Sequence, residues 1–159
     1  MEKFFYPRSV AVIGVSNAPD NLARNIVNNL MGFQFSGEIY CVGPREGVLF
    51  GQRIFPDILQ VPAEIELAVI LTPALTVPAI LEQCGRRGIR QAIIESGGFR
   101  EFARERAQLE QDILAVARRH GIRFIGPNGI GTEVDINPLV ALEAGQGCRV
   151  LDTRLSLIQ

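Results

Sequence analysis

The chain has 159 residues, a net charge of −1 and 47% hydrophobic residues, a balance that suits one globular domain with a proper core. This composition argues against a chain held to nucleic acid by bulk charge, and against disorder. No apolar run approaches the roughly 20 residues that cross a bilayer, and residues 1–7 are too mixed for a signal peptide. We therefore expect a cytoplasmic protein with no nucleic-acid or membrane partner.

Apolar runs alternate with helix-like segments along most of the chain. We expect five main strands at residues 10–13, 38–42, 67–71, 91–94 and 123–125, and a short extra strand at 52–55. Helices are expected at 21–31, 76–87 and 99–120, with one helical turn at 56–59. Strands and helices of this length in alternation predict right-handed βαβ units. The sequence therefore predicts an α/β fold, with a doubly wound, mainly parallel sheet and helices on both faces.

The last part of the chain has a different pattern. After Gly131 the periodicity is lost, residues 144–147 indicate a flexible connection, and residues 148–159 regain strand-like character. We expect one domain over residues 1–143. Residues 144–159 are expected to hold a linker and the possible first strand of a following domain, so that the chain is a fragment of a longer protein.

The turn after the first strand is the most informative segment. Gly14 ends the apolar run, and Ser16 and Asn17 lead toward a helix that begins near Asn21. The first backbone N–H groups of a helix lack partners within it and bind phosphate well. A dinucleotide fingerprint, G-x-G-x-x-G, is absent, because Ser16 and Ala18 follow Gly14. The turn predicts a nucleotide-containing ligand without that fingerprint.

Small and polar residues follow all five main strands. In an open parallel sheet, ligands bind beyond the carboxyl ends of the strands, where the strand order reverses. Any one of these ends could be a turn and nothing more, because Gly and Pro end strands everywhere. Five together indicate a ligand site; they lie at residues 14–17, 43–45, 72–74, 95–98 and 126–129.

The end of the second strand discriminates between nucleotides. An NAD site needs an acidic residue there for the ribose hydroxyls, whereas this chain has Arg45. A guanidinium suits a ribose phosphate because its planar donors match phosphate oxygens. The alternative is a solvated surface arginine, which the neighbouring Glu46 would favour.

Five motifs occur in an order and spacing that resemble one known domain: residues 10–17, 40–45, 67–74, 94–99 and 125–131. They are similar to the N-terminal CoA-binding domain of the nucleoside-diphosphate-forming acyl-CoA synthetases, relatives of the succinyl-CoA synthetase α subunit. The resemblance covers residues 1–143. It implies a Rossmann-like domain that binds coenzyme A.

The resemblance also implies roles for particular residues. Gly14, Ser16 and Asn17 would receive the phosphates of CoA, and the basic residue after the second strand, here Arg45, would face the adenosine and its phosphate. The family usually has Asn where this chain has Gly43, and Cys where it has Gly129. The remaining residues implied in the CoA cleft are Gly43, Pro44, Thr72, Pro73, Ala74 and Val77, and near the pantetheine arm Ser96, Gly97 and Asn128.

Catalysis in that family involves a phosphorylated histidine in the domain that follows. The single histidine here, His120, ends a predicted helix, and we interpret it as structural. The sequence shows no second acid or histidine that would act with Glu95 in catalysis, which favours a hydrogen-bonding role over that of a general base. Cys41, Cys84 and Cys148 are odd in number and far apart, so neither a disulfide framework nor a metal site is favoured. Cys41 is interpreted as a small buried residue rather than a reactive thiol.

These observations predict the CoA-binding domain of an acid–CoA ligase that is not catalytic by itself. Its partners would be CoA and further ligase domains or subunits, and a homo-oligomer is left open. Two alternatives remain at this stage. One is a free-standing, CoA-binding regulatory protein. The other is an NADP-dependent oxidoreductase that uses Arg45 for the 2′-phosphate, although the missing fingerprint and the missing catalytic domain argue against it.

Overall fold

The computed structural model describes residues 2–96 and 106–126, and the backbone of short strands between residues 132 and 157. Two compact units result, Met1–Asn128 and Gly129–Gln159. The elements of the first unit are α1 (Glu2–Phe5), β1 (Ser9–Ile13), α2 (Leu22–Gly32), β2 (Glu38–Val42), β3 (Gly47–Leu49), β4 (Gln52–Phe55), the 3₁₀ turn η1 (Ile58–Gln60), β5 (Leu67–Ile70), the 3₁₀ turn η2 (Ala74–Thr76), α3 (Val77–Arg86), β6 (Gln91–Ile94), α4 (Arg106–His120) and β7 (Arg123–Ile125).

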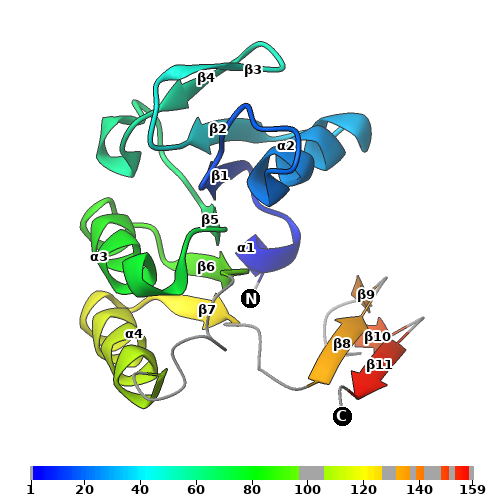
Figure 1. The fold of residues 1–159 in the computed structure, drawn as a ribbon, viewed down its shortest axis with the longest axis vertical. Coiled ribbons are helices and arrows are strands. Elements are labelled where there is room, and N and C mark those ends of the chain that lie inside the picture. The colour runs from blue at the N-terminus through cyan, green and yellow to red at the C-terminus, as the bar shows by residue number, and fades with distance from the viewer. Residues whose placement is uncertain are drawn as a thin grey trace. The chain divides into compact units, whose positions relative to one another are not determined.

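The first unit is built on a seven-stranded sheet in the order β3-β4-β2-β1-β5-β6-β7. Every neighbouring pair is parallel except β3 and β4, which form an antiparallel hairpin. The chain winds outward from β1 to β2 on one side, and from β5 to β7 on the other. Helix α2 covers one face, and α3 and α4 cover the other (Figure 1). The predicted fold, an α/β, Rossmann-like, doubly wound sheet, is confirmed.

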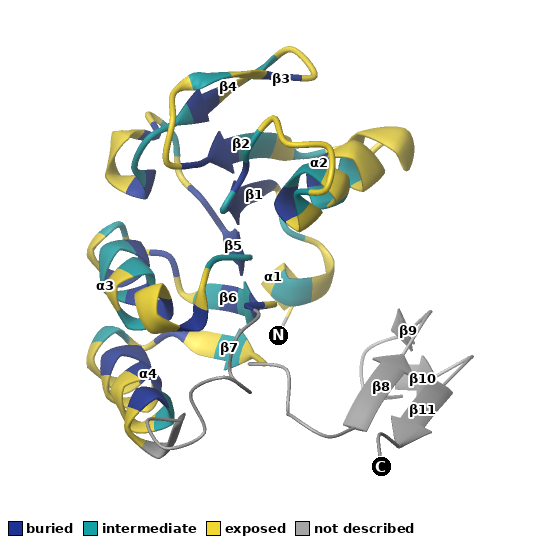
Figure 2. Ribbon diagram, viewed as in Figure 1, coloured by how far each residue is buried: buried dark blue, intermediate teal, exposed yellow. Residues whose placement is uncertain are grey.

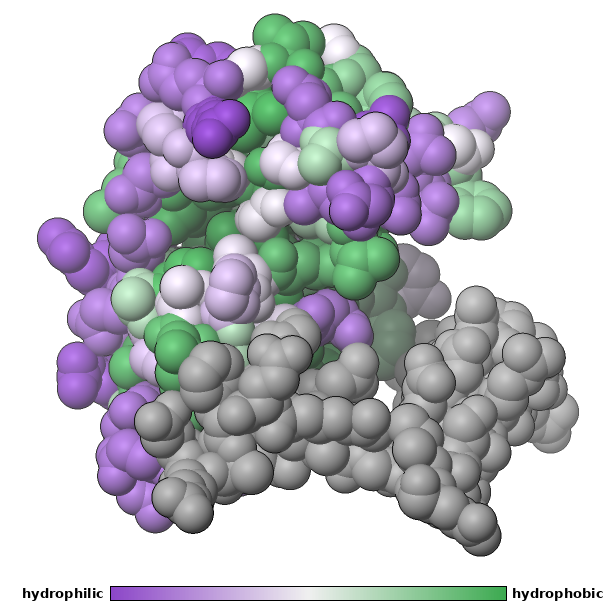
Figure 3. Space-filling view, viewed as in Figure 1, coloured by the Kyte–Doolittle hydropathy of each residue, from purple (hydrophilic) through white to green (hydrophobic). Residues whose placement is uncertain are grey.

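The core follows from this layering. All residues of β1 and β5 are buried, which is expected for central parallel strands covered on both faces (Figure 2). Edge strand β7 alternates instead between exposed and half-buried residues. On the face shown in Figure 3, hydrophobic residues gather across the middle of the described part, with hydrophilic residues above and to the left.

A buried carboxylate holds the amino ends of the two central strands together. Glu66 precedes β5, and its Oε2 accepts the backbone N–H of Arg8, before β1, at 2.8 Å. Its Oε1 lies 2.7 Å from the Arg8 guanidinium and 3.1 Å from Nζ of Lys3. These hydrogen bonds and charges lower the pKa of Glu66 to about 2. The cluster lies at the end of the sheet opposite to the predicted ligand site.

The structure differs from the sequence prediction mainly in its shortest elements. Helix α1 and strand β3 were not predicted, and the predicted turn at 56–59 is a 3₁₀ turn at Ile58–Gln60. The part of the predicted helix 99–120 before Arg106 lies outside the described residues. None of the helices in the described segments is both long and apolar enough to cross a bilayer.

The second unit contains two antiparallel strand pairs. Strand β8 (Thr132–Ile136) pairs with β11 (Thr153–Leu157), and β9 (Leu139–Ala141) pairs with β10 (Cys148–Val150). The strands at 132–136 and 139–141 lie where the sequence showed no periodicity. The predicted connection at 144–147 falls outside the described residues, and the predicted domain boundary after residue 143 stays a prediction.

Candidate functional site

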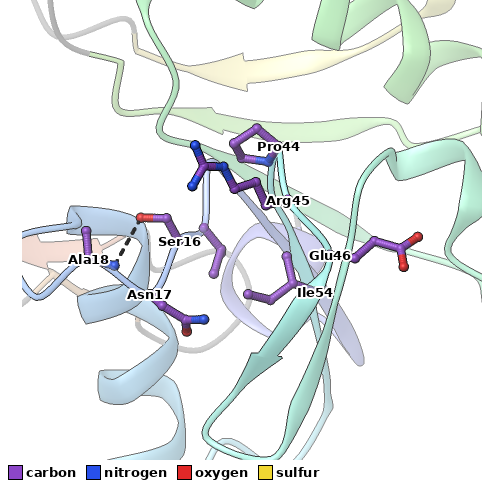
Figure 4. Close-up of a pocket in the computed structure, with 8 residues that line it drawn as sticks. Ser16, Asn17, Ala18, Pro44, Arg45, Glu46 and Ile54 are labelled. Atoms are coloured by element: carbon purple, nitrogen blue, oxygen red, sulfur yellow. Dashed lines mark hydrogen bonds between the residues drawn. The ribbon is translucent and has the colours of Figure 1, made fainter.

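Two adjoining cavities open at the carboxyl ends of the central strands. The first, of about 470 Å³, is lined by the loop after β1 and by the residues that follow β2 (Figure 4). The second, of about 440 Å³, extends from the ends of β1 and β2 to the loop after β5 and to α3. Pro44 lines both cavities. The second cavity includes the crevice between β1 and β5, where the strand order reverses and where the sequence predicted a ligand site, and the first lies between the ends of β1 and β2.

The loop after β1 requires glycine at its first position. Gly14 has φ +104°, and a Cβ atom there would lie 2.1 Å from the carbonyl oxygen of Leu71, which follows β5. The backbone N–H groups of Gly14 and Val15 both donate to the carbonyl of Val42, at 2.9 Å each. Close approach on one side and hydrogen bonds on the other fix the loop between its two neighbouring strands.

Asn21 organises the rest of this loop. Its Oδ1 caps α2 by accepting the N–H of Arg24 at 2.7 Å, and accepts the N–H of Ser16 at 3.3 Å. Its Nδ2 donates to the carbonyl of Gly14 at 3.0 Å. The Ser16 hydroxyl accepts the N–H of Ala18 at 3.4 Å (Figure 4).

For one donor, the N–H of Arg24, these bonds correct the expectation that the first N–H groups of the helix lack partners. The N–H of Arg24 is held by Asn21 at a short distance, so it is not available to a ligand. The bonds to the N–H groups of Ser16 and Ala18 are at the long end of the hydrogen-bond range. A phosphate oxygen can compete for those two donors, because charge-assisted hydrogen bonds are the stronger ones.

Arg45 faces this loop across the first cavity. Figure 4 shows its guanidinium directed toward Ser16, whereas the carboxylate of the neighbouring Glu46 points away. The two side chains therefore point in different directions, and the adjacent acidic residue does not face the same part of the cavity. The β1 loop and the basic residue after β2 lie in one cavity, as the sequence analysis required.

Gly43 brings these two segments close together. A Cβ atom at this position would lie 1.9 Å from the carbonyl oxygen of Val15. The Gly43 N–H continues the parallel ladder by donating to the carbonyl of Phe55 at 2.9 Å. A side chain at position 43 would force the β1 loop away from β2 and widen the first cavity.

The second cavity combines apolar walls with a few polar groups. Its apolar residues are Ile13, Val42, Pro44, Pro56, Ile58, Leu71, Pro73 and Ile80, and its polar side chains are Asn21, Asp57, Thr72, Thr76 and Gln83. Asp57 caps η1 through Oδ1, which accepts the N–H of Leu59 at 2.8 Å, and its Oδ2 accepts from Nε2 of Gln83 at 3.4 Å. Sequence reasoning did not identify Asp57, Thr76 or Gln83 as site residues.

Most of the predicted site residues that the structure describes lie in these cavities: Ser16, Asn17 and Arg45 line the first, Gly14, Gly43, Thr72 and Pro73 line the second, and Pro44 lines both. Ala74, Val77 and Ser96 are instead buried and are not among the lining residues. The Ser96 hydroxyl lies 3.5 Å from the carbonyl of Ile70. Gly97 and Asn128 fall outside the described residues. The predicted roles of all these residues in binding CoA stay predictions.

The other reactive side chains lie outside both cavities. Burial raises the pKa of Cys41 to about 11 and that of Cys84 to about 12, which keeps both thiols protonated. Burial also raises the pKa of Glu95. His120 packs against Gly85, and its Nε2 lies 2.9 Å from a carboxylate oxygen of Glu82 on α3, so it ties the two helices together. The described residues contain no cluster of three side chains suited to a metal ion.

Comparison with known proteins is consistent with a CoA site. The chain is 37% identical over 153 residues to acetate–CoA ligase [ADP-forming] I of Archaeoglobus fulgidus, and the aligned region covers 94% of this chain and 22% of that protein. It is 38% identical over 135 residues to acetate–CoA ligase [ADP-forming] I subunit alpha of Pyrococcus furiosus, and the aligned region covers 82% of this chain and 29% of that subunit. The chain thus spans less than a third of the length of these relatives.

Solved structures show the same fold. The dinucleotide-forming acetyl-coenzyme A synthetase 1 of Ca. Korarchaeum cryptofilum, in complex with phosphate and ADP, superposes with a TM-score of 0.74 at 31% identity over 83% of this chain and 28% of that one. A hypothetical protein of Pyrococcus horikoshii superposes with a TM-score of 0.59 at 16% identity over 78% of each chain, a likeness of fold alone. Residues 8–135 match the family described as CoA binding domain, and the chain belongs to that family.

Proposed function

We propose that this chain binds coenzyme A across the carboxyl ends of β1, β2 and β5, as the CoA-binding part of a nucleoside-diphosphate-forming acid–CoA ligase. The observation that supports it best is the first cavity, where the loop of Ser16 and Asn17 and the guanidinium of Arg45 lie together. An anionic ligand with two separate phosphate groups suits such a pair of binding elements.

In this proposal the pyrophosphate of CoA lies on the β1 loop. It takes the N–H groups of Ser16 and Ala18, whose present bonds to Asn21 and Ser16 are long. The 3′-phosphate on the ribose lies against Arg45. Gly14 and Gly43 contribute through the backbone, because a side chain at either position would displace the loop.

The chain's own part in the reaction is to hold and orient CoA. Acyl transfer in such a ligase needs an acyl phosphate, which we assign to other domains or subunits. Two observations support this division: the chain spans 22% of one relative, and another relative is a separate alpha subunit of which it spans 29%. The acyl substrate would be chosen by those other parts.

Calorimetry with three ligands tests the proposal. CoA, dephospho-CoA and NADPH are titrated into the purified chain under identical conditions. We expect CoA to bind, dephospho-CoA to bind more weakly because it lacks the phosphate that faces Arg45, and NADPH to give no signal. Binding of NADPH without binding of CoA at millimolar concentration would contradict the proposal and favour the oxidoreductase alternative.

A further inference from the structure

The second cavity has the composition of a site for a mostly apolar group that carries a few polar atoms. Apolar side chains line it from several elements, among them Val42 of β2, Ile58 of η1 and Ile80 of α3. Its volume of about 440 Å³ lies within the range of small-molecule sites. Sites of this kind use their few polar groups to fix the orientation of the ligand.

Asp57 and Gln83 supply two of these polar groups. Oδ1 of Asp57 is occupied by the N–H of Leu59, at 2.8 Å, so this side chain is held in place by the cap that it forms. Oδ2 lies 3.4 Å from Nε2 of Gln83, a long contact that leaves the carboxylate oxygen able to accept a stronger bond. The pair therefore offers a fixed acceptor beside an amide that can donate or accept.

The two cavities also differ in charge. Arg45 and Glu46 line the first, where only the guanidinium is directed toward Ser16, and Asp57 lines the second, with Pro44 shared between them. A carboxylate disfavours a phosphate and favours a hydrogen-bond donor, whereas the guanidinium does the reverse. A nucleotide that spans both cavities is thereby oriented, with its phosphates in the first and its base in the second.

We propose that the second cavity is a purine pocket in which Asp57 and Gln83 recognise the 6-amino edge of adenine. This inference rests on the proposed function. The 6-amino group donates to Oδ2 of Asp57, and the ring nitrogen N1 accepts from the Gln83 amide. A 6-oxo purine presents an acceptor at position 6 and a donor at position 1, so its oxygen faces the carboxylate. Gln83 adapts by rotating its amide, and Asp57 carries the discrimination.

The test compares CoA with its hypoxanthine analogue, in which a 6-oxo group replaces the 6-amino group. We expect the wild-type chain to prefer CoA by about tenfold or more. In the analogue, the 6-oxo oxygen and Oδ2 of Asp57 are both hydrogen-bond acceptors, and they would face each other with no donor between them. Asp57→Asn keeps the cap of η1, because Asn caps as well as Asp. Its amide can donate to the 6-oxo group, so the preference should fall below about threefold. Gln83→Met should weaken both ligands alike.

Matched controls come from α4. Gln108 donates to Asp112 at 2.8 Å, which is the same kind of Gln–Asp contact on an exposed surface away from both cavities. Asp112→Asn and Gln108→Met should leave the affinity for both ligands unchanged. Circular dichroism of all four variants confirms that they are folded.

The outcomes separate the two proposals. If CoA binds but Asp57→Asn keeps the wild-type preference for adenine, the purine pocket is refuted and the CoA site stands. If the Asp57 and Gln83 variants weaken 4′-phosphopantetheine, which has no base, as much as CoA, the pantetheine arm occupies the second cavity and the inference is equally refuted. If the wild-type chain binds neither CoA nor its analogue, both the proposed function and the inference fail.

Discussion

Replacing Arg45 by Gln removes the guanidinium that faces the β1 loop in the first cavity. Hydrogen bonds to charged groups contribute about 1.5–3 kcal/mol, which corresponds to about 10- to 150-fold in affinity. Because Arg45 is exposed, solvent screening places the expected effect near the lower limit. We therefore expect the Kd for CoA to rise about tenfold.

Calorimetry with CoA and dephospho-CoA measures this effect and identifies the phosphate concerned. If Arg45 binds the ribose phosphate, its replacement should weaken dephospho-CoA by less than about threefold. Arg53→Gln is the matched control, because Arg53 stacks on Phe55 at 5.0 Å in β4 and does not line either cavity. An equal loss for both ligands, or no loss for CoA, would refute the reasoning.

Three further predictions concern stability and reactivity. Folding lowers the pKa of Glu66 from 4.5 to about 2, so its carboxylate stabilises the fold above pH 4.5, and this contribution is lost as the pH falls toward 2. Across that pH window, the free energy of unfolding measured in urea should depend less on pH in Glu66→Gln than in the wild type. An equal pH dependence in the two proteins would contradict the stabilising role of the Glu66 cluster. Gly14→Ala should lower the free energy of unfolding by about 1–3 kcal/mol because of the backbone overlap, and unchanged unfolding by urea would argue against the close approach. In a Cys148→Ser variant, Cys41 and Cys84 should react with a thiol reagent only after denaturation, because both are buried; rapid labelling of the native chain would be inconsistent with their burial.

The sequence predicted the sheet well because its strands carry local signals. The fully buried strands β1 and β5 are almost continuous apolar runs, and the less buried strands at Glu38–Val42, Gln91–Ile94 and Arg123–Ile125 have the predicted bounds. Strand β3 is three residues long, and the turn that joins it to β4 has a phenylalanine, Phe50, at φ +49°. The other turn residue, Gly51 at φ +81°, is a turn signal, but phenylalanine is not, so the hairpin carried only part of the usual signal.

The candidate site was predictable only in part, for a related reason. Gly14, Ser16 and Arg45 directly follow strands, so their position at the ligand-binding edge follows from the topology. Asp57 and Gln83 are 26 positions apart, and only the packing of α3 beside η1 brings them together. Asn is a preferred N-cap residue, so the sequence did carry a signal for the bond that the N–H of Arg24 donates to Asn21, but the prediction of free helix N–H groups did not use it.

The central claim is that one nucleotide occupies the edge formed by the β1 loop and the segment after β2. A crystal structure of this chain with CoA tests it most directly. The account predicts the pyrophosphate within hydrogen-bond distance of the N–H groups of Ser16 and Ala18, with the 3′-phosphate at the Arg45 guanidinium. Electron density for CoA at any other surface, with the β1 loop free of phosphate, would contradict it.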